Sequence, residues 1–139
     1  MRKYFLMPFI NEKSLTARYV QFYAVRRKQM KNMTLREVCS TIGVSRRAVQ
    51  GYEKEALVSA TGKNNRGYLL YNAAAQNRIK KIKLYQDMGF SLKQIKQVID
   101  DTGPTLRNAL TQQREKLSQD IQQKNAMISI IQEMLKNLP

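Results

Sequence analysis

Apolar residues recur at helical spacing along most of the chain, and polar caps and glycines mark where the helices begin and end. Thr34 and Glu37 form the sequence of a capping box, which predicts a helix over 35–42. Gly43 is suited to the left-handed position that ends a helix. Ser45 is then the expected cap of a second helix that runs to about residue 55.

Two short helices joined by a tight glycine turn predict a helix-turn-helix over 35–54. The side chains at the expected helix–helix contacts are apolar, and Cys39 falls where only a small side chain fits. An ordinary helical hairpin in a protein core is the alternative. The expected contact residues are Val38, Ile42, Val44, Val49 and Tyr52.

Residues 57–71 have the pattern of a β-hairpin. Apolar stretches at 57–58 and 68–71 flank a segment rich in glycine and asparagine, which tolerate the positive φ angles of a hairpin tip. Because the hairpin follows the helix-turn-helix directly, we expect it to act as a wing. An ordinary polar surface turn is the alternative.

Two further helices are predicted after the hairpin. Asn72 is the expected cap of a helix over 73–88, which turns Ile79, Ile82 and Tyr85 inward. A second capping box, Ser91 with Gln94, opens a helix over 92–101.

The last segment, 104–139, reads as one long helix that opens on Gly103-Pro104. From residue 110, seven of nine positions in alternating steps of four and three are apolar, which is coiled-coil spacing. This apolar stripe must be buried, either against a partner helix, which we favour, or against the chain's own domain. With a partner helix, the apolar residues of the stripe are the predicted dimerisation residues: Leu110, Leu117, Ile121, Ile128, Ile131, Leu135 and Leu138.

The pattern therefore divides the chain into a basic N-terminal extension (1–32), a domain with the helix-turn-helix and the hairpin (33–103) and the long helix (104–139). In the extension, Ser14 precedes apolar residues at helical spacing, which predicts a helix over 14–28. The first apolar run is short and has no small-residue cleavage site, so we interpret it as something other than a signal peptide. No segment approaches the ~20 apolar residues of a membrane span.

The net charge narrows the classes of molecule that the chain is expected to bind. The 139 residues hold 25 Lys and Arg against 10 Asp and Glu, a net charge of +15, with a pI of about 10.2. Such a surplus attracts polyanions, and nucleic acid is the first candidate. An anionic membrane surface, or a basic protein with no such partner, remains open.

The chain has no His and one Cys. Most acid–base and nucleophilic mechanisms rely on His, a structural zinc site needs several Cys or His ligands, and disulfides need cysteine pairs. We therefore predict no enzyme activity, no cofactor and no metal site, and a reducing, cytoplasmic location associated with the nucleoid.

Candidate DNA contacts fall on two elements. The second helix carries side chains that pair with base edges in the major groove, and the hairpin tip carries basic, amide and aromatic donors for phosphates. A basic cluster at 78–83 is either a further phosphate contact or a solvated face. The helix residues are Arg46, Arg47, Gln50, Tyr52 and Lys54, and the wing residues are Lys63, Asn64, Arg66 and Tyr68.

From Met33 to Asp101 the sequence resembles the DNA-binding domain of the MerR family of bacterial transcription regulators. With the last helix, the resemblance covers about three quarters of the chain. The order and spacing of several stretches carry it: Thr34–Val38, Gly43–Ser45, Tyr52-Glu53, Gly67–Tyr71 and Met88–Ile95.

The resemblance implies a mainly α fold: a winged helix-turn-helix with a small β-hairpin wing, followed by an antiparallel coiled-coil dimerisation helix. It implies a homodimer that binds a pseudo-palindromic operator between promoter elements and distorts the DNA, where RNA polymerase is a further partner. Arg47, Tyr52 and Tyr68 match the family's DNA-contact positions. Gln50 stands where the family usually has an Arg, and Gly51 where it has an aromatic residue. Leu69 stands where an Arg commonly follows the wing Tyr, so the family's base preference is not carried over.

A regulator of transcription is thus the first functional hypothesis. An architectural or excisionase-like DNA-binding protein is the second, and an interaction protein that works through its coiled coil without DNA is the third. The identity of a small-molecule effector, the target operator and the sign of regulation stay open.

Overall fold

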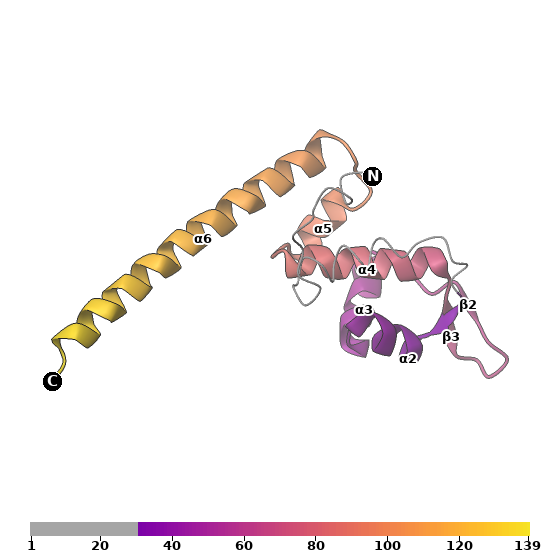
Figure 1. Ribbon diagram of the computed structural model, residues 1–139. Coiled ribbons are helices and arrows are strands. Elements are labelled where there is room, and N and C mark those ends of the chain that lie inside the picture. Colours follow the sequence, from indigo (N-terminus) through magenta and orange to yellow (C-terminus); the bar gives the residue numbers. More distant parts are fainter. Residues whose placement is uncertain (1–30) are drawn as a thin grey trace, which may run out of the picture. The chain divides into compact units, whose positions relative to one another are not determined.

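The computed structural model describes residues 31–139, so the predicted helix over 14–28 lies outside the described residues. The chain divides into one unit up to Leu84 and a second from Tyr85 to Pro139. The elements of the first unit, which shares α4 with the second, are β1 (Met33–Thr34), α2 (Leu35–Val38), a π-helical turn (Cys39–Gly43), α3 (Arg46–Lys54), β2 (Gly62–Lys63), β3 (Leu69–Tyr71) and α4 (Ala73–Asp87) (Figure 1).

The first predicted helix is present, but only its first turn is α-helical. The Thr34 hydroxyl accepts from the backbone N–H of Glu37 at 3.3 Å, and the Glu37 carboxylate reaches back to the Thr34 N–H at 3.4 Å, which confirms the capping box. From Cys39 the backbone continues as a wider π-helical turn. Gly43, with φ +78°, ends the segment in the left-handed conformation that was expected of it.

The second helix of the motif, α3, begins where the cap predicts. The Ser45 hydroxyl accepts from the Ala48 N–H at 2.9 Å. All of the predicted contact residues between the two helices are buried, whereas the cysteine between them is only partly buried, so the packing of the helix-turn-helix is confirmed. The buried residues are Val38, Ile42, Val44, Val49 and Tyr52.

The wing differs from its prediction in one arm. Leu57 and Val58 are buried core residues and belong to no strand, because the Leu57 N–H closes the end of α3 by donating to the Tyr52 carbonyl at 2.9 Å. The first arm is instead β2, which pairs antiparallel with β3.

A third strand, β1, was not predicted. It pairs with the other edge of β3, with Met33 opposite Tyr71, so the sheet order is β1-β3-β2. The side-chain nitrogen of Gln76 donates to the carbonyls of Tyr71 and Lys31, at 2.8 and 2.7 Å. This side chain therefore links the end of β3 and the segment just before β1 to the first turn of α4.

Helix α4 follows its prediction closely. The Asn72 side chain accepts from the Ala75 N–H at 2.9 Å, and Ile79 and Ile82 are fully buried. These side chains belong to the buried core of the first unit.

The second unit contains α5 (Leu92–Val98) and α6 (Pro104–Asn137). The Ser91–Gln94 capping box is confirmed, and α5 ends three residues earlier than predicted. After it, the Asp101 carboxylate accepts from the Gly103 N–H at 2.7 Å and shapes the turn into α6.

Helix α6 is long, as predicted, and none of its residues is buried. The apolar stripe is exposed by 37 to 63%: Leu110, Leu117, Ile121, Ile128, Ile131, Leu135 and Leu138. Within the described part of the chain, no helix combines the length and the apolar character that crossing a membrane requires.

Candidate nucleic-acid interface

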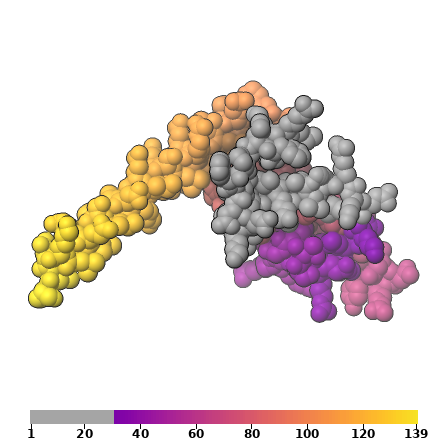
Figure 2. Space-filling view, in the orientation of Figure 1, coloured from indigo at the N-terminus to yellow at the C-terminus, as the bar shows by residue number. Residues whose placement is uncertain are grey.

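A groove of about 760 Å³ lies between the start of the helix-turn-helix and the wing. Figure 2 shows the wing standing out from the body of the helix-turn-helix on this side of the molecule. The wall of the groove is formed by the start of α2, by the first residue of α3 and by the wing tip. The lining residues are Thr34, Leu35, Arg36, Arg46, Asn64, Arg66, Gly67, Tyr68 and Leu69.

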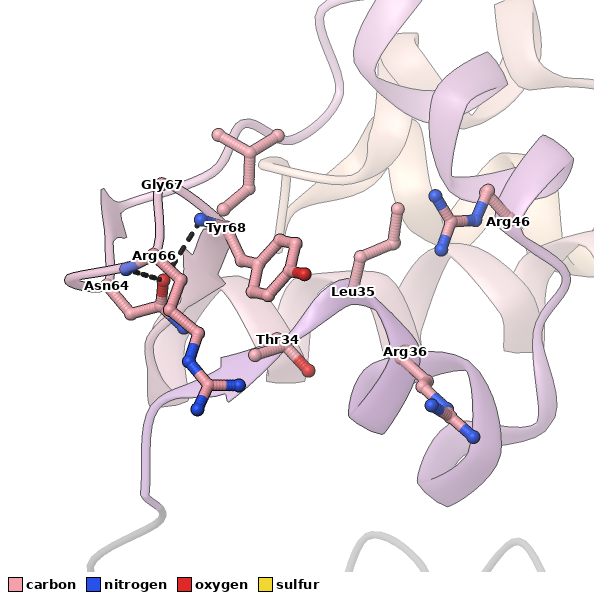
Figure 3. Close-up of a pocket in the computed structure, with 9 residues that line it drawn as sticks. Thr34, Leu35, Arg36, Arg46, Asn64, Arg66, Gly67 and Tyr68 are labelled. Atoms are coloured by element: carbon pink, nitrogen blue, oxygen red, sulfur yellow. Dashed lines mark hydrogen bonds between the residues drawn. The ribbon is translucent and has the colours of Figure 1, made fainter.

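Three arginines from three different elements face this groove. Arg36 comes from α2, Arg46 from α3 and Arg66 from the wing, and all three are exposed (Figure 3). No carboxylate is among the described residues that line the groove. Guanidinium groups bind phosphate oxygens through charge-assisted, often paired hydrogen bonds, so the groove is suited to an anionic ligand such as a nucleic-acid backbone.

The wing tip is held in shape by Asn64. Its side-chain oxygen accepts from the backbone N–H groups of Arg66 and Tyr68, both at 3.0 Å, and its carbonyl accepts from Gly67 at 2.9 Å. Gly67 has φ +80°, which favours glycine at this turn. The side-chain oxygen of Asn64 is thus used within the wing. The predicted contact of Asn64 with DNA concerns its side-chain nitrogen and stays a prediction.

The turn built by Asn64 presents Tyr68 to solvent. The side chain is 59% exposed, and its ring points from the wing toward Leu35 of α2 (Figure 3). Lys63 is also exposed, on β2. Arg66 and Tyr68 thus line the groove, Lys63 is exposed on the neighbouring strand, and the contact of these three residues with DNA stays a prediction.

Helix α3 turns one face to solvent and the opposite face to the core. Arg46, Arg47, Gln50 and Lys54 are exposed, so these four predicted contact residues lie together on an accessible face. Tyr52 is only 1% exposed. Its ring packs in the core and has almost no surface to offer to DNA, so for Tyr52 the structure bears out the packing role and leaves the DNA contact resting on the resemblance.

A buried polar link joins the wing to α3. The Tyr71 hydroxyl, on β3, donates to the carboxylate of Glu53, on α3. Burial, and then the hydrogen bond and the charge of Glu53, raise the pKa of Tyr71 well above its usual range. This link holds the wing against the recognition helix, and no local sequence pattern indicated it.

The basic side chains of the cluster at 78–83, on α4, take part in interactions within the protein. Arg78 donates to the carbonyl of Leu57, where it holds the end of α3, and burial lowers the pKa of Lys80. Lys81 and Lys83 also take part in interactions within the protein. Phosphate contact by this cluster stays a prediction.

Sequence reasoning missed one basic residue of the groove. Arg36 follows the Thr34 cap in α2, and it joins the site because β1 and β3 bring the start of α2 beside the wing.

The described residues hold no cluster of three or more metal-ligating side chains.

Comparison with known families agrees with this geometry. The family model described as "MerR HTH family regulatory protein" matches residues 33–102, half of the chain. The chain belongs to the MerR family. A second model, "MerR, DNA binding", matches residues 76–134, so the MerR match extends along most of α6.

Relatives within the MerR family share most of the described elements. The HTH-type transcriptional activator mta of Bacillus subtilis is 30% identical over 101 residues, which are 73% of this chain and 39% of mta. The structure of MtaN, the N-terminus of that protein, is similar with a TM-score of 0.61 and 29% identity, over 74% of this chain and 97% of that one. This chain spans about two fifths of the length of the curated relatives that it matches.

Two further MerR structures have the same fold. A transcriptional regulator from Bacillus cereus gives a TM-score of 0.65 at 25% identity, over 77% of this chain and 82% of that one. HiNmlR, described as a MerR family regulator lacking the sensor domain and bound to promoter DNA, gives a TM-score of 0.55 at 21% identity, over 71% and 80% of the two chains.

Proposed function

We propose that this MerR-family chain is a sequence-specific DNA-binding regulator of transcription. The observation that carries the proposal is the juxtaposition of two surfaces: the exposed cationic face of α3 and the arginine-lined groove beside the wing. A helix of this kind fits a major groove, where its side chains reach base edges. Arg66 and Tyr68 then lie where a wing contacts the flanking phosphates.

We further propose that the working form is a homodimer held by α6. Its apolar stripe is exposed over the whole helix and follows heptad spacing, and an antiparallel coiled coil would bury it. A symmetric dimer presents two recognition helices, so its operator is a pseudo-palindrome.

Promoter DNA is the ligand that we propose. HiNmlR is described as bound to promoter DNA, and mta is named a transcriptional activator. Distortion of the promoter and cooperation with RNA polymerase, in the cytoplasm and on the nucleoid, belong to the same proposal, and we propose no catalytic role.

Single substitutions separate base reading from phosphate binding. With an operator selected from random duplex DNA, Arg47→Ala should weaken operator binding by about 1–3 kcal/mol and relax the preference at one base position. Arg66→Ala should weaken binding to all sequences alike and reduce the salt slope by about one. Lys136→Ala, which removes an equal charge from the far end of α6, is the matched control. Unchanged affinity and base preference in Arg47→Ala would contradict the placement of α3.

Dimerisation is tested on the apolar stripe. Replacing Leu117 and Ile128 by Asn should yield a folded monomer in sedimentation equilibrium, with operator affinity reduced to that of a half-site. Replacing Ser129 by Ala, on the side of α6 away from the stripe, is the control. A dimer that survives the double substitution would place the interface elsewhere.

A further inference from the structure

Gly51 is a glycine for which the fold gives no reason. It lies in the middle of α3, and its φ is not in the left-handed region. A Cβ added to it would meet nothing within 4 Å. Glycine inside a helix lowers stability relative to alanine, because it gains backbone freedom in the unfolded chain. The fold alone would therefore favour alanine at this position.

Gly51 borders the exposed face of α3. It follows Arg47 by four residues and precedes Lys54 by three, and side chains at these spacings are neighbours on a helix surface. Val49 and Tyr52 occupy the opposite, buried side. The helix thus carries a strip of bare backbone with Arg47 one turn before it and Lys54 one turn after it, both toward the exposed face, while Glu55 lies one turn after it on the opposite flank.

The other edge of the same face is occupied differently. Arg46 lies five residues before Gly51, and it points into the groove beside the wing. At 3.6 residues per turn, Arg46 and Gly51 lie about 140° apart around the helix. One edge of the recognition face therefore carries the guanidinium of Arg46, whereas Gly51 has no side chain at the other edge.

We propose that the bare strip at Gly51 receives the sugar–phosphate backbone of one DNA strand, between Arg47 and Lys54. This inference rests on the proposed function. The major groove is about 12 Å wide, and a helix with its side chains measures about 10–12 Å. A helix in the groove therefore meets both walls, and a missing side chain on one edge lets that wall approach.

The approach strengthens the phosphate contact of Lys54, because an attraction between opposite charges grows as they come closer. The second strand is held on the opposite edge, by Arg46 and the wing. Gly51 is thus a positioning residue for the depth and tilt of α3 in the groove.

The test uses Gly51→Ala and Gly51→Leu in the full chain, because alanine and leucine both favour helix. The Tm of the free protein should rise by about 2–8 °C, the gain expected from removing a helical glycine. The Kd for duplex DNA should rise roughly tenfold for alanine, the value of one lost hydrogen bond to a charged group, and further for leucine. The loss should be similar for operator and random duplexes, since phosphates are common to both.

Ser129→Ala is the control, because it improves helix propensity on α6 without adding bulk to α3. It should leave the Kd unchanged. The inference fails if wild type binds DNA and Gly51→Ala binds as tightly, if the variants lower the Tm, or if only the preference among sequences changes. Absence of salt-dependent DNA binding by wild type would instead overturn the proposed function itself.

Discussion

Replacing Tyr71 by Phe removes the link between the wing and the recognition helix and leaves the ring in place. The Tyr71 side chain is fully buried, and its hydroxyl donates to the partly buried carboxylate of Glu53. A hydrogen bond to a charged group contributes about 1.5–3 kcal/mol. Because water can reach part of the Glu53 carboxylate once the hydroxyl is gone, we expect the lower part of that range, about 1.5–2 kcal/mol.

The loss should depend on pH in a defined direction. Burial and Glu53 raise the pKa of Tyr71 in the folded protein, whereas an unfolded tyrosine titrates near 10. The contribution of the Tyr71 hydroxyl to the free energy of unfolding is therefore complete below pH 10. It is lost as pH rises above 10, by about 1.4 kcal/mol per pH unit. The wild type should approach the Tyr71→Phe variant in stability between pH 10 and 11.

Urea denaturation followed by circular dichroism at pH 7, 10 and 11 measures both effects. All the other tyrosines are present in both proteins, so their titration cancels in the difference. Equal stability of the two proteins at pH 7, or a difference that stays constant from pH 10 to 11, would refute the reasoning. A parallel loss of operator affinity at pH 7 is expected, because the wing is then free to move relative to α3.

Two further predictions concern a turn and a helix start. Asn64→Ala removes the acceptor for two backbone N–H groups at the wing tip, so trypsin should cleave after Arg66 faster; Asn64→Asp keeps an acceptor oxygen and should resist. Equal cleavage of all three proteins would count against the turn. The backbone hydrogen bond from Gly103, and then that from the Thr105 side chain, lower the pKa of Asp101, so its stabilisation should be complete above about pH 4 and lost as pH falls through the lowered pKa. Asp101→Asn should flatten this acid dependence in thermal melts from pH 3 to 7, and an unchanged acid profile would contradict it.

Local chemistry made much of the fold predictable. The capping boxes at Thr34 and Ser91 and the left-handed Gly43 depend on residues within one or two turns, and all are confirmed. Tyr52 allows a comparison between prediction from helix packing and prediction from the family resemblance. Its place at the contact between the two helices correctly predicted burial, whereas the DNA contact that the resemblance implies stays a prediction.

Features that depend on distant residues escaped prediction. Strand β1 has two residues, too few for any periodicity, and it exists only because β3 pairs with it from 36 to 38 residues away. The same pairing brings Arg36 to the groove, and the link between Tyr71 and Glu53 crosses 18 residues. The first arm of the wing was misplaced because Leu57 and Val58 are apolar for the sake of the core rather than of a strand.

Selection of genomic fragments bound by the purified chain, followed by sequencing, tests the central claim most directly. The account predicts enrichment of promoter fragments that share an inverted repeat, with binding that weakens steeply as salt rises. A variant with Arg46 and Arg47 both replaced by Ala should show no such enrichment. Fragments without a common motif, or enrichment that survives this double substitution, would contradict a recognition helix that reads DNA.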